Sequence, residues 1–132
     1  MIKFPDKKYN IIYADPAWNY ETWSEGASRN VKGKYKTMSM KDIYELPIQD
    51  IAENDCILFI WVTYPKLIEG IETIKQWGFT YKTCAFSWIK TNKSFPTNQT
   101  TFLPQDSFKS FWGMGYWTRA NNELCLLGTK GK

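Results

Sequence analysis

The chain has 132 residues, of which 43% are hydrophobic and 17% aromatic, and its 17 basic and 13 acidic residues give a net charge of +4. This length suits one domain with a single core over residues 1–132, and no apolar run is long enough to cross a membrane or to act as a secretory signal, so we expect a cytoplasmic protein. Histidine is absent and the three cysteines form no C-x-x-C pair, which excludes imidazole catalysis and argues against a metal site.

The first predicted strand spans residues 9–14 (YNIIYA), and a long loop over residues 19–38 follows it. A short helix comes next, because Ser39 can cap its free N–H groups with Asp42 three residues further on, and Pro47 ends it. Long loops in small domains are typically functional. This loop leaves the carboxyl end of a strand, where open α/β sheets bind their ligands.

Three further strands are predicted at residues 57–62 (ILFIWV), 81–89 (YKTCAFSWI) and 123–127 (ELCLL). Two of the predicted strands, residues 57–62 among them, are near-continuous apolar runs, which is typical of strands covered on both faces. A second long loop, at residues 92–112, separates the last two strands. The alternation of strands and helices indicates an α/β fold with at least partly parallel strands.

The clearest predicted helix runs over about residues 65–77. Pro65 suits the first helical position, where its missing N–H is harmless, and Gly78 is expected as the carboxyl-terminal cap. Trp77 is predicted to lie in the core, as is Trp88 in the third strand. One face of the helix carries an apolar stripe that would pack against the sheet; it consists of Leu67, Ile68, Ile71 and Ile74.

The first strand runs directly into the motif Asp15-Pro16-Ala17-Trp18. Proline stiffens the turn, so its carbonyl can point outward as an acceptor beside the Asp15 carboxylate. Two acceptors that converge on one point can hold an NH2 group, and the indole of Trp18 offers a flat wall for a heteroaromatic ring. The motif therefore predicts a site that orients the exocyclic amine of a base. The alternative is a strand-ending turn with an Asx-type hydrogen bond and a core tryptophan.

Basic residues gather in the loop after this motif, since every charged side chain from residue 27 to residue 41 is positive. Basic groups interleaved with aromatic rings can meet phosphates while the rings stack on bases. We therefore expect Arg29, Lys32 and Lys34 to contact the phosphates of a nucleic acid. The alternative is a solvated lysine loop with no ligand.

Residues 11–18 (IIYADPAW) resemble the signature strand and Asp-Pro-Pro-Trp motif of the adenine N-6 methyltransferases. That family includes the catalytic subunit of the eukaryotic messenger-RNA adenosine methyltransferase and many bacterial and phage DNA enzymes. The chain is similar to the bacterial and phage branch in particular. Further segments match in order along essentially the whole chain: residues 35–39 (YKTMS), 58–63 (LFIWVT), 77–79 (WGF), 88–92 (WIKTN) and 113–131 (GMGYWTRANNELCLLGTKG).

The resemblance implies a Rossmann-like, S-adenosylmethionine-dependent methyltransferase fold. It also implies transfer of a methyl group from S-adenosylmethionine to the N-6 amine of adenine in nucleic acid, with DNA favoured over RNA. Asp15 and the carbonyl of Pro16 would hold that amine, and Asp15 would also meet the cofactor. The positions that match further substrate contacts of the family are Trp18, Tyr35, Trp61 and Glu123.

The sequence departs from the family pattern in two places. Ala17 stands where the family has a second proline, which makes the turn less rigid. The chain also ends at Lys132, before the family segments that supply further strands and most cofactor contacts, so we expect an incomplete sheet. An open edge would then be covered by an oligomer or by the missing part. The alternative function is a catalytically weak or inactive nucleic-acid-binding remnant or partner subunit.

Overall fold

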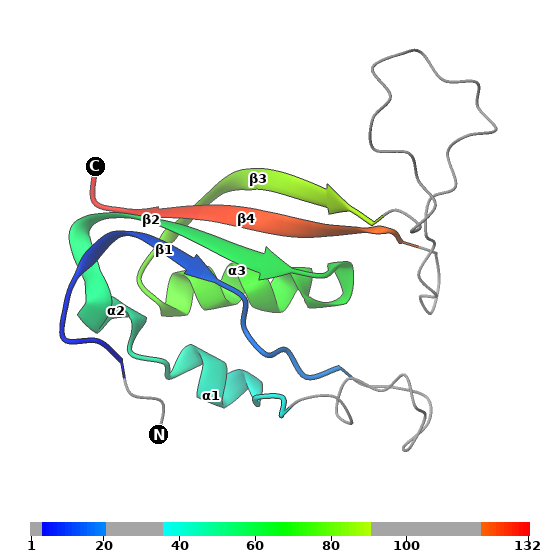
Figure 1. Cartoon of the computed structure of the whole chain (residues 1–132), viewed down its shortest axis with the longest axis horizontal. Helices are drawn as coiled ribbons and strands as arrows, with labels where there is room; N and C mark the ends of the chain where they lie inside the picture. Colours follow the sequence, from blue (N-terminus) through cyan, green and yellow to red (C-terminus); the bar gives the residue numbers. More distant parts are fainter. Residues whose placement is uncertain (1–3, 21–35, 91–119) are drawn as a thin grey trace, which may run out of the picture.

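The fold is seen in a computed structural model that describes residues 4–20, 36–90 and 120–132 (Figure 1). Strands and helices alternate along the chain, and the α-helices lie on one face of a single sheet. The predicted α/β class is therefore confirmed. Most of the two predicted loops, residues 19–38 and 92–112, lies outside the described residues. Within the described ranges no helix is both long enough and apolar enough to cross a bilayer.

The sheet consists of β1 (Tyr9–Ala14), β2 (Ala52–Val62), β3 (Thr80–Ile89) and β4 (Asn122–Lys130). Their order across the sheet is β1-β2-β4-β3. β1 and β2 are parallel, whereas β4 is antiparallel to both of its neighbours. β1, β2 and β3 consequently run in the same direction, and their carboxyl ends lie at the edge of the sheet where β4 begins (Figure 1). The predicted parallel pairing is confirmed.

Two short helices lie between β1 and β2, namely α1 (Met40–Tyr44) and α2 (Ile48–Ile51). The predicted cap of α1 is confirmed, because the Ser39 hydroxyl accepts the Asp42 N–H (3.1 Å) and the Asp42 carboxylate accepts the Ser39 N–H (3.3 Å). Hydrogen bonds from the side chain and then the backbone of Ser39 lower the pKa of Asp42. The sequence does not predict α2, since so short a helix shows no helical period.

The longest helix, α3 (Leu67–Gln76), follows a 3-10 turn, η2 (Tyr64–Lys66). Pro65 lies within that turn, so α3 begins slightly later than predicted. Its predicted end is confirmed, because Gly78 adopts a positive φ of 80° and donates its N–H to the Lys75 carbonyl (2.9 Å). A side chain at this left-handed position would be strained, which is why glycine terminates the helix here.

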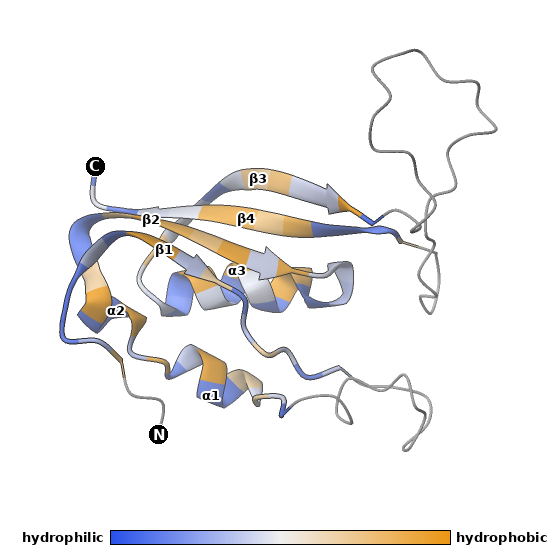
Figure 2. Cartoon of the chain, in the orientation of Figure 1, coloured by the Kyte–Doolittle hydropathy of each residue, from blue (hydrophilic) through white to orange (hydrophobic). Residues whose placement is uncertain are grey.

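The hydrophobic core lies between the sheet and the helices, and Figure 2 shows hydrophobic residues on the strands and on the helices. Alternate residues of β2 point into it, and Leu58, Ile60 and Val62 are almost fully buried. Trp77 is 1% exposed, as predicted. Its indole N–H donates to the Ile43 carbonyl (2.9 Å), which ties the end of α3 to α1.

No described helix covers the opposite face of the sheet (Figure 1). Tyr13 of β1 is 66% exposed and Trp88 of β3 is 56% exposed, so the prediction of Trp88 as a core residue is wrong. The prediction that residues 57–62 are covered on both faces is also wrong within the described chain, because Ile57 is 39% exposed. Both errors have one cause: an apolar run reports the composition of a strand and not what lies against its second face.

The apolar stripe of α3 is confirmed only in part. Ile74 is fully buried, and Leu67 and Ile71 pack against the core. Ile68 is 80% exposed, so its place in the stripe is wrong. Gly70 occupies the buried face instead, and a Cβ there would come within 2.4 Å of a side chain of β2. The glycine therefore allows the helix to approach the sheet closely.

Separate replacement of Ile74 and Ile68 by alanine tests this orientation of α3. Ile74→Ala removes buried methyl groups and leaves a cavity, so we expect the free energy of unfolding to fall by about 2–5 kcal/mol. Ile68→Ala is the matched control on the same helix, with an expected change within about 0.5 kcal/mol. Urea denaturation measures both values. Equal losses would show that α3 presents a different face to the sheet.

Candidate active site

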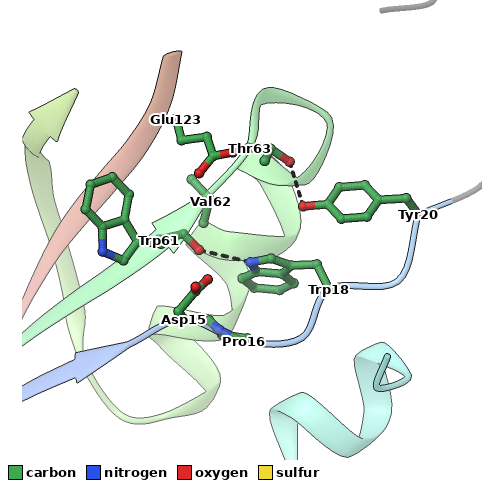
Figure 3. A pocket seen from close by; sticks show the side chains of 8 residues that line it. All are labelled: Asp15, Pro16, Trp18, Tyr20, Trp61, Val62, Thr63 and Glu123. Carbon is green, nitrogen blue, oxygen red and sulfur yellow. Dashed lines mark hydrogen bonds between the residues drawn. The ribbon is translucent and has the colours of Figure 1, made fainter. Parts of the chain in front are cut away.

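The candidate site lies at the edge of the sheet where β1, β2 and β3 end and β4 begins. Here the residues surround a cavity of about 120 Å³. Most small-molecule sites measure roughly 300–1,000 Å³, so this cavity holds one ring or one end of a ligand. Figure 3 shows the lining residues, which are Asp15, Pro16, Trp18, Tyr20, Trp61, Val62, Thr63 and Glu123.

Every predicted site residue that the structure describes lines this one cavity. They come from the ends of three strands: Asp15, Pro16 and Trp18 follow β1, Trp61 lies in β2 and Glu123 lies in β4. Their assigned roles stay predictions. The remaining predicted contacts lie outside the described residues and also stay predictions; they are Arg29, Lys32, Lys34 and Tyr35.

The Asp15 carboxylate points into the cavity (Figure 3). No hydrogen bond joins it to any of the residues that the structure describes, so the described chain does not show the alternative Asx-type turn. Partial loss of surrounding water raises the pKa of Asp15, and the negative charge of Glu123 raises it further. The carboxylate therefore faces the cavity without a hydrogen-bond partner among the described residues.

The turn after β1 is fixed by three hydrogen bonds. The Trp18 backbone N–H donates to the Pro16 carbonyl (2.8 Å), and the Trp18 indole N–H donates to the Trp61 carbonyl (2.9 Å). The Ala17 carbonyl accepts the Met38 N–H (2.9 Å). The turn is therefore held in place by its neighbours, although Ala17 lacks the rigidity of proline.

Two details of the predicted motif need correction. The Pro16 carbonyl is not a free acceptor, because one of its two lone pairs takes the Trp18 N–H. Trp18 is 3% exposed, so its ring does not form an open wall, and the core-tryptophan alternative describes it better. Trp18 lines the cavity from within the core and braces the turn against β2.

Trp61 offers the accessible ring that was expected of Trp18. Its indole N–H donates to the Tyr13 hydroxyl. Its ring lies edge-on to the rings of Tyr13 (6.4 Å between centroids) and Trp88 (6.2 Å). Contacts on two sides fix the plane of this indole beside the cavity, so Trp61 is the better candidate for stacking on a flat ligand.

The lining also includes Tyr20, Val62 and Thr63, which the sequence did not predict, and the unpredicted Lys90 lies beside it. The hydroxyls of Tyr20 and Thr63 share a hydrogen bond (3.0 Å) at one wall, and Lys90 forms an ion pair with Glu123. Thr63 directly follows β2 and Lys90 directly follows β3. The signal that identified Asp15, a polar residue at the carboxyl end of a strand, would have found both of them.

The polar groups at this edge suit a cationic ligand. The cavity lining includes two carboxylates, Asp15 and Glu123. The Asn19 side-chain oxygen, next to Trp18 in the chain, is buried and receives no hydrogen bond from the described residues. A buried acceptor without a donor is costly, but Asn19 is not among the residues that line the cavity.

Comparison with known proteins identifies relatives along nearly the whole chain. The family model described as MT-A70 matches residues 9–132. The type II methyltransferase M.MunI of a Mycoplasma species is 38% identical over 104 residues, which cover 67% of this chain and 45% of that protein. The Arabidopsis thaliana N6-adenosine-methyltransferase non-catalytic subunit MTB is 35% identical, and the human N(6)-adenosine-methyltransferase catalytic subunit METTL3 is 26% identical. Each of these two matches covers 94% of this chain, but 14% of MTB and 18% of METTL3. The chain thus spans less than half the length of these relatives.

Replacing Asp15 by asparagine tests the electrostatics of the cavity. Because its pKa is raised above the ordinary 3.8, the folded chain binds this proton more tightly than the unfolded chain, and stability falls as the pH rises between the two values. At pH 7 the charged carboxylate is therefore unfavourable. We expect Asp15→Asn to raise the free energy of unfolding by less than about 1 kcal/mol, a small gain because water screens the group.

Asp42→Asn is the matched control, with the opposite expected sign. The pKa of Asp42 is lowered, so its stabilising contribution is present above pH 3.8 and is lost as the pH falls through the folded value. Urea denaturation from pH 3 to pH 7 should show the gain in Asp15→Asn vanishing at low pH. A loss of stability in both variants at pH 7 would contradict the conclusion that the charged Asp15 carboxylate is unfavourable in the folded chain.

Proposed function

The chain belongs to the MT-A70 family, and we propose that it transfers a methyl group from S-adenosylmethionine to the N-6 amine of adenine in nucleic acid. The observation that carries the proposal is the Asp15 carboxylate, which points into the cavity beside Trp61 with no hydrogen bond from the described residues. We favour DNA over RNA as the substrate, because the net charge is +4 and the chain resembles the bacterial and phage branch of the family.

S-adenosylmethionine carries a sulfonium and an ammonium group, and the residues of this edge fit both. Asp15 and Glu123 supply negative charge at the cavity. When bound, the cofactor supplies an activated methyl group on a good leaving group. The family resemblance implies that Asp15, which lines the cavity, would also meet the ammonium group of the cofactor.

The chain's own residues make the amine of adenine nucleophilic. That nitrogen reacts poorly because its lone pair is delocalised into the ring, and acceptors placed at its N–H groups favour a more tetrahedral nitrogen. Asp15 accepts one N–H, and the second lone pair of the Pro16 carbonyl accepts the other. Trp18 holds this turn against β2 through the Trp61 carbonyl. Catalysis of this kind consists mainly of positioning and electrostatics, which suits a protein without histidine.

After methyl transfer the nitrogen carries one proton too many. Asp15 lies at the amine, and its raised pKa makes it a better proton acceptor than an ordinary aspartate. In duplex DNA the adenine must first leave the base stack to reach such a cavity. Phosphate contacts from Arg29, Lys32 and Lys34, and a substrate contact from Tyr35, are part of the same proposal.

A second candidate function is nucleic-acid binding as a partner subunit without catalysis. The similarity to MTB favours it, because that relative is named a non-catalytic subunit. Ala17 in place of proline is a second reason. This alternative predicts salt-sensitive binding to single strands and no binding of S-adenosylmethionine. Calorimetric titration with S-adenosylmethionine therefore distinguishes the two functions.

Methyl incorporation from labelled S-adenosylmethionine into DNA and RNA oligonucleotides tests catalysis directly. We expect Asp15→Ala to lower the rate at least about 100-fold, because it removes an acceptor aimed at the reacting group. Asp50→Ala, at an exposed position of α2 away from the cavity, is the matched control and should keep the wild-type rate.

Oligonucleotides in which purine replaces adenine lack the amine and should receive no methyl group. A folded chain that binds both S-adenosylmethionine and nucleic acid, yet methylates no oligonucleotide, would contradict the catalytic proposal.

A further inference from the structure

Lys90 lies beside the cavity and takes no part in the steps above. It directly follows β3, and its ammonium group forms an ion pair with the Glu123 carboxylate of β4. Its backbone N–H donates to the Asn121 side-chain oxygen (2.9 Å), and its ammonium lies 5.7 Å from the centre of the Trp88 ring. Backbone, charge and ring contacts together hold this lysine at the end of the sheet.

Glu123 faces Asp15 across the cavity (Figure 3). Two carboxylates at one small site repel each other, and the charge of Glu123 raises the pKa of Asp15. The ammonium group of Lys90 pairs with the Glu123 carboxylate, and its positive charge therefore weakens the repulsion between Glu123 and Asp15. Among the described residues, the titratable groups near this pair include the hydroxyls of Tyr20, bonded to Thr63, of Tyr13, bonded to Trp61, and of Tyr64, bonded to Asn122 beside Glu123.

We propose that Lys90 is a positioning residue that fixes the Glu123 side chain at the cavity wall and offsets its charge, so that Asp15 stays ionised as the acceptor of the substrate amine. The consequence for catalysis rests on the proposed function. The effect of the ion pair on the ionisation of Asp15 is independent of the proposed function, because this effect follows from the charges alone.

The exposure of the Lys90–Glu123 pair indicates that it affects the ionisation of Asp15 more than the stability of the fold. Its side chain is 40% exposed and that of Glu123 is 28% exposed, so water screens the pair and its contribution to folding is small. Asp15 and Glu123 line the same small cavity, and the negative charge of Glu123 raises the pKa of Asp15. Removal of Lys90 should therefore change the ionisation of Asp15 far more than it changes the fold.

Carbon-13 NMR titration of the carboxyl groups tests the inference without cofactor or substrate. Lys90→Met removes the charge and keeps the length of the side chain, and we expect the pKa of Asp15 to rise by about 0.5 or more. Lys90→Arg keeps the charge and should restore a value near that of the wild type. In the double variant Lys90→Met with Glu123→Gln, the rise should disappear.

Lys75→Met is the matched control. Lys75 pairs with Glu72 on α3 (3.5 Å), so this variant loses the same charge and the same kind of ion pair outside the cavity lining. The pKa of Asp15 should not move in this variant. If Lys90→Met does not fold, Lys90→Gln removes the charge with a polar side chain and serves the same titration.

An unchanged pKa of Asp15 in the folded, uncharged Lys90 variants would overturn the inference, whatever their methyl transfer rate. Conversely, a raised pKa in a chain that methylates nothing would leave the electrostatic role in place and contradict only the proposed function. In an active protein, the acidic limb of the pH–rate profile should move to higher pH in Lys90→Met and return in Lys90→Arg. A profile that keeps its wild-type position would overturn the role of Lys90 in the reaction.

Discussion

One hydrogen bond, from the Trp18 indole N–H to the Trp61 carbonyl, determines where the candidate site lies. It is 2.9 Å long and part-buried, and Trp18 is 3% exposed, so the indole is largely removed from water. Leaving a buried donor or acceptor without its hydrogen bond costs about 1–3 kcal/mol, so this hydrogen bond is expected to persist. It joins the turn after β1 to the end of β2, and it therefore fixes the Asp15 carboxylate relative to the rest of the cavity.

The order of the strands then decides which groups face Asp15. β4 is inserted antiparallel between β2 and β3, so its first residues lie at the edge where the other strands end. Glu123 and Lys90 meet there because Trp88 of β3 pairs with Glu123 in the sheet register. An acceptor, an opposing acid and a compensating base thus come from three strands. The chemistry of the cavity follows from this topology as much as from the motif.

Features that depend on local sequence could be predicted. The strand at Tyr9–Ala14, the capping box of Ser39, the glycine end of α3 and the carboxylate at the tip of β1 each follow from short-range patterns. Features that depend on tertiary packing could not. Ile68 and Trp88 are exposed because nothing described covers them, and the hydrogen bond that occupies the Pro16 carbonyl depends on the geometry of the turn. The Lys90–Glu123 pair joins residues far apart in sequence, and only the strand register brings them together.

The position of the adenine amine tests the central claim most directly. A crystal structure of the chain with bound adenosine measures the distance from the N-6 nitrogen to the Asp15 carboxylate oxygens. The proposed site predicts a hydrogen bond of about 2.7–3.2 Å, with the ring against Trp61 in the cavity at the strand ends. Adenosine bound with its amine turned away from Asp15, or an Asp15 carboxylate bonded to the protein's own backbone, would contradict the claim.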